Sequence, residues 1–171
     1  GNDPKAREML QLGAADDAYC TFQHLRLGNA VAKERADFAV ERLRAKAAEG
    51  DAVAQFYWGA SLNHGLGVNK DHKEAVVWYS KAAANGHVVA QSAMAWAHDH
   101  GEGVDKDSSK ALDWYRIAAE AGYAGSCYNL GVCFATGDGV EQDVKTGLKW
   151  SVPRSLFNAD SRLNLQVQTS S

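Results

Sequence analysis

The stretch GLGVNKDHKEAVVWYSKAAANG, residues 65–86, decides the fold of this chain. It combines a glycine-bracketed turn, an aspartate, a Trp-Tyr pair and an Ala-Ala ending before a glycine. The pattern returns 36 residues later at 101–122, and a third copy begins at 137 and breaks off. The copies align without gaps in five columns: Gly65, Gly101 and Gly137; Gly67, Gly103 and Gly139; Val68, Val104 and Val140; Asp71, Asp107 and Asp143; Trp78, Trp114 and Trp150. A period of this size predicts a stack of supersecondary units.

Each copy predicts a pair of helices. In the first, helix A covers residues 51–64, and Gly65 ends it because glycine readily adopts the left-handed conformation. Asp71 is expected to cap helix B, with Glu74 completing a capping box. The apolar positions of helix B share one helical face, which predicts a buried stripe of Ala75, Trp78, Tyr79 and Ala82. We therefore expect the three recurring tryptophans to be core residues and the three recurring aspartates to be helix caps.

The flanking sequence indicates one solenoid domain whose terminal repeats are degenerate or truncated. Helices are expected at residues 5–12, 15–27 and 33–48, the last pair resembling a repeat that lost its turn. Pro153 should end the last helix near Ser151, because proline lacks the N–H that the helix requires. The predicted organisation is a helical segment at 1–14, a degenerate repeat at 15–50, repeats at 51–86 and 87–122, a truncated repeat at 123–153, and a tail at 154–171 that could be a cap, an extended segment or disordered.

Composition narrows the function classes. The net charge is −3 with a pI of about 6.1, and acidic and basic residues are mixed along the chain. No basic block suggests nucleic-acid binding, and no apolar run approaches the roughly 20 residues of a membrane span. Cys20, Cys127 and Cys133 make a poor disulfide framework, so buried thiols are expected, with a Cys20 link to another chain as the alternative.

The repeat resembles the Sel-1-like repeat family, a relative of the tetratricopeptide repeats. The resemblance is carried by Leu130-Gly131 in helix A, by the G-x-G-V turns, by the capping aspartates and by the closing WYSKAA at residues 78–83. It is clear over residues 51–152 and weak over 15–50. It implies an all-α fold, a right-handed α/α superhelix of antiparallel helix pairs whose A helices line a concave groove. It also implies a non-catalytic adaptor that binds another protein.

The same resemblance selects the residues that should contact the partner in the groove. Trp96 stands out among them, because the equivalent positions carry the smaller Ala60 and Val132. Its alternative role is packing against a neighbouring helix or against the N-terminal segment. The predicted partner-binding residues are Phe56, Asn63, His64, Ser92, Trp96, Asp99, His100 and Tyr128.

The sequence gives little support to a catalytic site or a metal-binding site. His98 and His100 are two apart on a helix and point about 200° from each other, whereas helical metal ligands are four apart. His64 and His100 occupy equivalent sites and could approach each other, but no third ligand is evident. The turns lack the Lys-Ser/Thr of a phosphate loop. We expect no enzyme activity, no metal and no cofactor.

Four hypotheses follow. The first is a protein-binding adaptor, expected to be bacterial. The second is an immunity protein that neutralises a secreted, type VI-like toxic effector. The third, from another class, is a small-ligand-binding protein or hydrolase of the cysteine-rich repeat type, although the paired cysteines of that type are missing. Self-association is the fourth. Because the chain begins at Gly1, a removed leader would not be visible, and a soluble protein of the bacterial periplasm or cytoplasm is expected.

Overall fold

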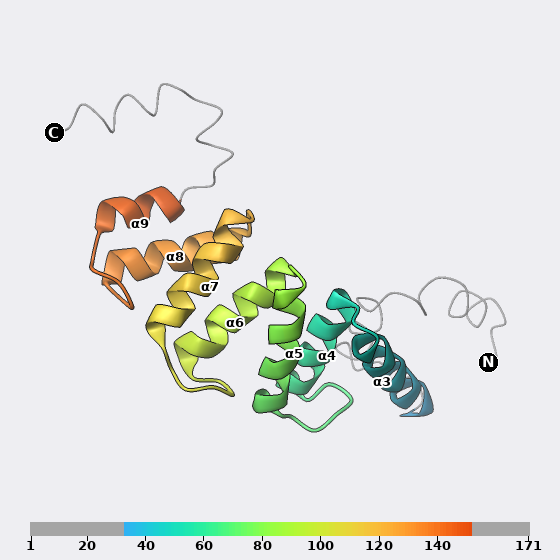
Figure 1. Cartoon of the computed structure of the whole chain (residues 1–171). Coiled ribbons are helices and arrows are strands. Elements are labelled where there is room, and N and C mark those ends of the chain that lie inside the picture. The colour runs from blue at the N-terminus through green and yellow to red at the C-terminus, as the bar shows by residue number, and fades with distance from the viewer. Residues whose placement is uncertain (1–32, 152–171) are drawn as a thin grey trace, which may run out of the picture.

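The structure, a computed structural model, describes residues 33–151, which form an all-α array (Figure 1). Each helix packs against the next one in the chain, and α3 and α9 lie at opposite ends of the array. The predicted all-α solenoid is thereby confirmed. The helices are α3 (Lys33–Ala48), α4 (Ala52–His64), α5 (His72–Ala84), α6 (Val88–His100), α7 (Ser108–Glu120), α8 (Ala124–Thr136) and α9 (Val144–Ser151).

The helix pairs are α4 with α5, α6 with α7, and α8 with α9. The predicted helix at 33–48 is present as α3. The last described residue, Ser151, lies in α9, so the helix end expected from Pro153 lies outside the described residues. The helices expected at 5–12 and 15–27, Cys20 and the 154–171 tail lie outside the described residues. Within 33–151, no helix has the length and apolar character that a membrane crossing demands.

The recurring aspartates cap the B helices, as predicted. The carboxylates of Asp71, Asp107 and Asp143 accept hydrogen bonds from the backbone N–H three residues on, at 2.9, 3.0 and 3.0 Å. Hydrogen bonds from Lys110 and Thr146 hold the pKa values of Asp107 and Asp143 below the usual range. These caps satisfy backbone donors that no helical carbonyl can reach.

The prediction that Glu74 completes a capping box by accepting from the Asp71 backbone N–H is wrong. The backbone N–H of Asp71 donates to the Leu62 carbonyl of helix α4 at 2.9 Å, so Glu74 has no donor there to bind. Glu74 instead accepts a hydrogen bond from the Trp78 indole at 3.3 Å. The same bond from the capping residue back to helix A recurs in the next two units, at 2.8 and 2.7 Å. Each B helix is thus tied to its own A helix at its first residue.

The core runs along the inner faces of the helices, and its tryptophans are less buried than predicted. Trp78, Trp114 and Trp150 are half-buried at the edge of the core. Lys81 lies over the Trp78 ring, 3.9 Å from its centre, as a cation–π pair. The other predicted stripe residues, Ala75, Tyr79 and Ala82, are buried. A further buried column, Val40, Val76 and Leu112, was not included in the sequence stripe.

Both thiols within the described residues are free. Cys133 is buried and Cys127 is half-buried, so the prediction of buried thiols is met by the first and partly by the second. Burial raises the pKa of the Cys133 thiol, and the nearby Asp99 carboxylate acts in the same direction. A raised pKa keeps this sulfur protonated and unreactive.

In the second and third turns, the second glycine is where one unit meets the one before it. Gly103 has a φ of +77°, and a Cβ placed there would overlap the carbonyl oxygen of His72 in the first turn of α5. Gly139 has a φ of +73° and stands in the same relation to Ser108 in α7. Only glycine meets both requirements, the positive φ and the absent side chain.

A second link between units is polar and, among the described residues, is complete only once. The Gln55 amide donates to the Ala47 carbonyl at 3.2 Å, and its oxygen accepts from the Asn85 amide at 3.2 Å. Gln91 repeats the first contact with Ala83 at 3.5 Å, but its oxygen is buried with no partner, since Ala121 replaces the asparagine. A buried unpaired oxygen of this kind destabilises the fold.

The turn contact predicts unequal costs for two Gly→Ala substitutions. Gly86 has a φ of +79°, nearly that of Gly103, but an added Cβ there has nothing within 4 Å. Gly86→Ala should therefore lower the free energy of unfolding by about 1 kcal/mol through backbone strain alone. Gly103→Ala should lower it by about 2 kcal/mol more, because the backbone of α5 must move. Urea denaturation followed by circular dichroism measures both, and equal losses would contradict the proposed contact.

The unpaired Gln91 oxygen predicts a stabilising substitution. Ala121 is exposed and has φ −74° and ψ 0°, close to the −82° and 12° of Asn85. Ala121→Asn should donate to Gln91 and raise the free energy of unfolding by about 0.5–1.5 kcal/mol. The gain should vanish in a Gln91→Met background, which has no acceptor. A gain that survives in that background would show that the new hydrogen bond is not its source.

Candidate partner-binding groove

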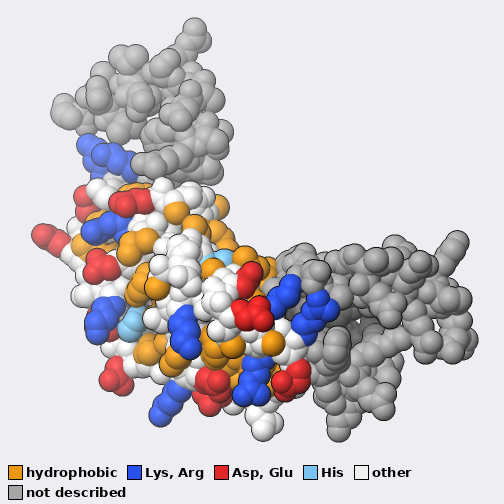
Figure 2. Space-filling model, turned by 45° about the vertical axis from the view of Figure 1, so that its right-hand side comes forward, with side chains coloured by type: hydrophobic (Ala, Val, Ile, Leu, Met, Phe, Trp, Pro, Cys, Tyr) orange, Lys and Arg blue, Asp and Glu red, His pale blue; other side chains and the backbone are white. Residues whose placement is uncertain are grey.

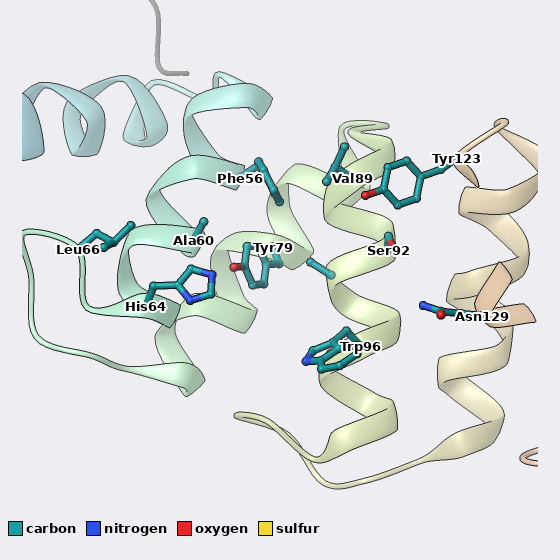
Figure 3. Close-up of a pocket in the computed structure, with 11 residues that line it drawn as sticks. Phe56, Ala60, His64, Leu66, Tyr79, Val89, Ser92, Trp96, Tyr123 and Asn129 are labelled. Carbon is teal, nitrogen blue, oxygen red and sulfur yellow. The ribbon is translucent and has the colours of Figure 1, made fainter. Parts of the chain in front are cut away.

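A groove of about 660 Å³ lies between the A helices α4 and α6 (Figure 3). Most of its lining is apolar, and the lining includes no Lys, Arg, Asp or Glu side chain. The residues that line it are Phe56, Ala60, His64, Leu66, Tyr79, Val89, Ser92, Ala93, Trp96, Tyr123 and Asn129. Adjacent A helices therefore enclose a surface suited to apolar side chains of a ligand.

Helical spacing explains which residues reach the groove. Phe56, Ala60 and His64 are four apart, so they lie along one face of α4. Ser92 and Trp96 have the same spacing on α6. Figure 3 shows the two faces turned toward each other, with the Tyr79 ring of α5 between them. The wall is thus made by A helices, and a B helix supplies part of the floor.

Trp96 is the largest exposed apolar side chain on the groove's α6 side. Its side chain is 48% exposed, and its ring stacks on the His100 ring with centres 3.6 Å apart and 18° between the planes. The His100 ring is itself fixed, because Nδ1 lies 3.2 Å from the Trp96 carbonyl oxygen and 3.6 Å from an Asp99 carboxylate oxygen. Trp96 is therefore held in one orientation before any ligand binds.

The residues equivalent to Trp96 in the neighbouring units differ from it in size and in exposed fraction. Ala60 is buried at 4% exposure, whereas Trp96 and Val132 are 48% and 40% exposed. Tyr128, one turn before Val132 on α8, is 62% exposed. The exposed apolar surface thus continues from the groove onto α8.

Four of the eight predicted contact residues line the groove: Phe56, His64, Ser92 and Trp96. His100 lies beneath Trp96 and supports it. The other three are outside the groove lining. Tyr128 lies on α8, and the remaining two are engaged within the protein.

Asn63 and Asp99 have equivalent positions and bind neighbouring side chains. The Asn63 oxygen lies 2.6 Å from Nδ1 of His72, which is 3.9 Å from a Glu102 carboxylate oxygen. Asp99 accepts a hydrogen bond from the Tyr115 hydroxyl at 3.5 Å. Both side chains therefore support the ends of the A helices, in addition to any contact with a ligand.

Several lining residues were missed by the sequence analysis. Tyr79 was assigned to the core, but its ring is large enough to reach both the core and the groove. Leu66, Tyr123 and Asn129 lie in a turn, at a helix start and on the next unit, where the A-helix spacing does not apply. Tyr123 could have been found as a large aromatic residue in place of the capping Asp51 and His87.

The one tyrosine on the groove floor is neutral, and the groove lining carries no acidic or basic side chain other than His64. Burial, followed by the Glu102 carboxylate, raises the pKa of Tyr79 well above its usual range, so its hydroxyl stays neutral. Within residues 33–151, no three His, Cys, Asp or Glu side chains gather in a way that could hold a metal ion. Figure 2 shows acidic and basic side chains interspersed with apolar ones, without a block of either sign on that face.

His87 connects the groove to the start of helix α6. Its ring stacks on Phe56 with centres 4.8 Å apart, and its Nδ1 accepts a hydrogen bond from the Ala90 N–H at 3.2 Å. It is therefore the N-cap of α6, in the place that Asp51 takes in α4. Burial lowers the pKa of this imidazole, against the opposing effect of the Asp51 carboxylate.

Capped helix pairs at a 36-residue period, with a groove between their A helices, define a solenoid of the tetratricopeptide-like class. Within that class, the chain belongs to the Sel1 repeat family, whose model matches residues 52–87, 88–123 and 124–151. Sel1 repeats generally mediate protein–protein interactions and are typically non-catalytic scaffolds.

Two bacterial proteins with solved structures have a similar fold. A Sel1 repeat protein of Oxalobacter formigenes is 29% identical, with a TM-score of 0.67 over 85% of this chain and 61% of that one. The protein c5321 of uropathogenic Escherichia coli, a protective antigen, is 26% identical, with a TM-score of 0.67 over 84% and 34%. This chain thus spans less than two thirds of either protein.

A third similarity concerns the fold alone. Cysteine-rich protein B of Helicobacter pylori is 18% identical, with a TM-score of 0.57 over 81% of this chain and 99% of that one. No curated protein matches the chain.

The His87 cap predicts a pH dependence of stability. The imidazole must be neutral to accept the Ala90 hydrogen bond, and its pKa is lowered by folding. The contribution should be complete above the unfolded pKa of about 6.5 and be lost as the pH falls through the folded value. His87→Asn keeps a cap that does not titrate in this range, so its free energy of unfolding should fall less between pH 7.5 and 5.5. Equal losses in both proteins would exclude His87 as the source.

Proposed function

We propose that this chain is a non-catalytic adaptor that binds a segment of another protein in the groove between α4 and α6. The observation that carries the proposal is Trp96, a half-exposed indole fixed by stacking on His100 at the edge of an apolar groove. Tryptophan in such a position is the residue type that most often dominates the binding energy of protein interfaces.

The shape and polarity of the groove support a protein ligand. A volume of about 660 Å³ accommodates several side chains of a bound segment. The lining is apolar, with the polar groups of His64, Ser92 and Asn129 placed among apolar ones. Apolar side chains of the partner would supply affinity there, and the polar groups would fix the register of the segment.

Pre-organisation strengthens the proposal. His100 supports Trp96, and Phe56 is held between His87 and Tyr79, with ring centres 4.8 and 5.7 Å away. Side chains that are already ordered lose little conformational entropy on binding. Tyr128 and Val132 extend the same surface onto α8, and a longer segment would reach them.

The identity of the partner divides the proposal into two versions. One version is a component of a bacterial envelope or signalling system, and the other is a secreted toxic effector that this chain would neutralise. Bacterial origin is supported by the bacterial proteins of the same fold. The cysteine-rich alternative is not favoured, because Cys127 and Cys133 are both free.

Replacing Trp96 tests the proposal. Affinity capture from source-cell extract would compare the unchanged chain with a Trp96→Ala, His100→Ala variant. Loss of the indole should weaken partner binding at least 30-fold, the equivalent of about 2 kcal/mol, as measured by calorimetry with the captured protein. The partner's identity would then separate the envelope component from the toxic effector.

The control is Ile117→Ala on helix α7. Ile117 is 45% exposed, close to the value for Trp96, but it does not line the groove. Its replacement should leave the affinity unchanged, and circular dichroism should show all three proteins equally folded. A partner held equally well without Trp96 and His100 would refute the groove as the binding site.

A further inference from the structure

The turns at the C-terminal ends of the A helices become acidic from one unit to the next. Leu66, which lines the groove from the first turn, has Glu102 and Asp138 as its equivalents in the next two turns. In the same way, Asn63 near the end of α4 has Asp99 as its equivalent near the end of α6. This side of the array is therefore neutral beside α4 and carries three carboxylates beside α6 and α8. We call Asp99, Glu102 and Asp138 the acidic edge.

The contacts of Glu102 place it at the turn end of the groove between α4 and α6. Its carboxylate oxygen lies 3.9 Å from Nδ1 of His72, and that nitrogen lies 2.6 Å from the side-chain oxygen of Asn63 on α4. Burial and, after it, the Glu102 carboxylate raise the pKa of Tyr79, so this carboxylate lies near the groove floor. The Glu102 side chain is 41% exposed, and a bound ligand can reach it.

Asp99 and Asp138 continue the acidic edge toward α8. An Asp99 carboxylate oxygen lies 3.6 Å from Nδ1 of His100, the ring on which Trp96 stacks. Burial raises the pKa of the Cys133 thiol of α8, and the carboxylates of Asp99 and Asp138 add to that effect. The acidic edge therefore follows the same course as the exposed apolar surface, which runs from Trp96 onto α8.

Cationic side chains are scarce on this side of the array. The A helices α4, α6 and α8 contain no Lys or Arg, whereas α3, α5, α7 and α9 contain eleven. The three turns that follow the A helices add only Lys70 and Lys106. Within residues 33–151, no Lys or Arg nitrogen lies within 4 Å of a carboxylate of the acidic edge, and the ionic contacts there are with histidines.

We propose that the segment bound in the groove carries a lysine or arginine next to its apolar anchor, and that this cation lies at the acidic edge. The inference rests on the proposed function and names the chemistry of the partner's segment. The stem of the basic residue would cover the exposed Trp96 indole, with its charged end beside the carboxylates. The carbonyl groups at the C-terminal ends of α6 and α8 favour a cation at the same place.

The acidic edge acts on the choice of partner more than on the total affinity. Charges at the rim of an interface speed the association of a partner of opposite sign and repel one of the same sign. An acidic segment and a nucleic acid would both be repelled here. The apolar groove then supplies most of the affinity, and the acidic edge selects among apolar segments those that carry a basic residue.

Selection of random peptides displayed on phage tests the proposal. The library would be selected on the full chain and on an Asp99→Asn, Glu102→Gln, Asp138→Asn variant, at about 50 mM salt, where screening is weak. Peptides selected on the unchanged chain should combine an aromatic or aliphatic residue with a nearby Lys or Arg. Peptides selected on the variant should keep the apolar residue and lose the basic preference.

Binding measurements with one synthetic peptide from the first selection give a second readout. The variant should bind this peptide at least about fivefold more weakly, mainly because association is slower. The difference should shrink at about 500 mM salt, because salt screens exposed charges. A peptide whose Lys or Arg is replaced by Met should bind both proteins equally.

A charge-matched variant is the control. Glu41→Gln, Asp113→Asn, Glu120→Gln removes the same three charges from exposed positions on α3 and α7, outside the groove lining. It should bind the peptide as the unchanged chain does, and circular dichroism should show all variants equally folded. An equal loss in this variant would overturn the proposal, because net charge and not the acidic edge would then be the cause.

Trp96→Ala separates this inference from the proposed function. Selected peptides that require Trp96 but show no preference for Lys or Arg would overturn the inference and leave the groove as the binding site. Selected peptides that bind equally well without Trp96 would refute the groove itself. A library that yields no binding peptide would count against both.

Discussion

The array depends on the contact between the turn of one unit and the backbone of the unit before it. At Gly103 the space for a side chain is already filled by the His72 carbonyl, and at Gly139 by that of Ser108. Since these contacts are between backbones, they allow little variation in distance, and every unit must approach its predecessor in the same way. The backbone hydrogen bond from each capping aspartate to its own A helix then fixes the turn within the unit. The period of the sequence and the spacing of the A helices follow from these two constraints.

The groove is a consequence of that spacing. Because the backbones are held at a constant distance, the width left between two A helices depends on the side chains that face each other. Ala60 is small enough to be buried, and the equivalent Trp96 is not, so the indole remains at the edge of the groove. The units agree in the residues that hold them together and differ in those that face the groove. A partner can therefore be selected without any change in the scaffold.

Sequence patterns predicted the scaffold well because its requirements are local. A capping aspartate or a left-handed glycine acts within a few residues, and these features were found where the repeat placed them. The groove was harder to predict, because a lining residue needs only to be close in space. Tyr79 reaches it from a B helix, and Asn129 reaches it from the next unit. Asn63 and Asp99 face toward the A-helix ends, but their hydrogen bonds to His72 and Tyr115 could not be read from spacing.

Equivalent positions of the repeat can differ in the residue itself or in the residues around it, and the two kinds of difference have different consequences. At Gln55 and Gln91 the residue is the same and the partner differs, so one oxygen is bonded to Asn85 and the other is left unpaired. At Leu112 and Leu148 the residue is again the same, but only the first is buried, and of their helices only α7 is followed by another A helix among the described residues. At Ala60 and Trp96 the residue itself differs, and so does its exposure. The first two cases concern stability, because an unmet requirement remains in the fold. The third leaves no such requirement unmet, and the exposed indole is the basis of the proposed ligand contact.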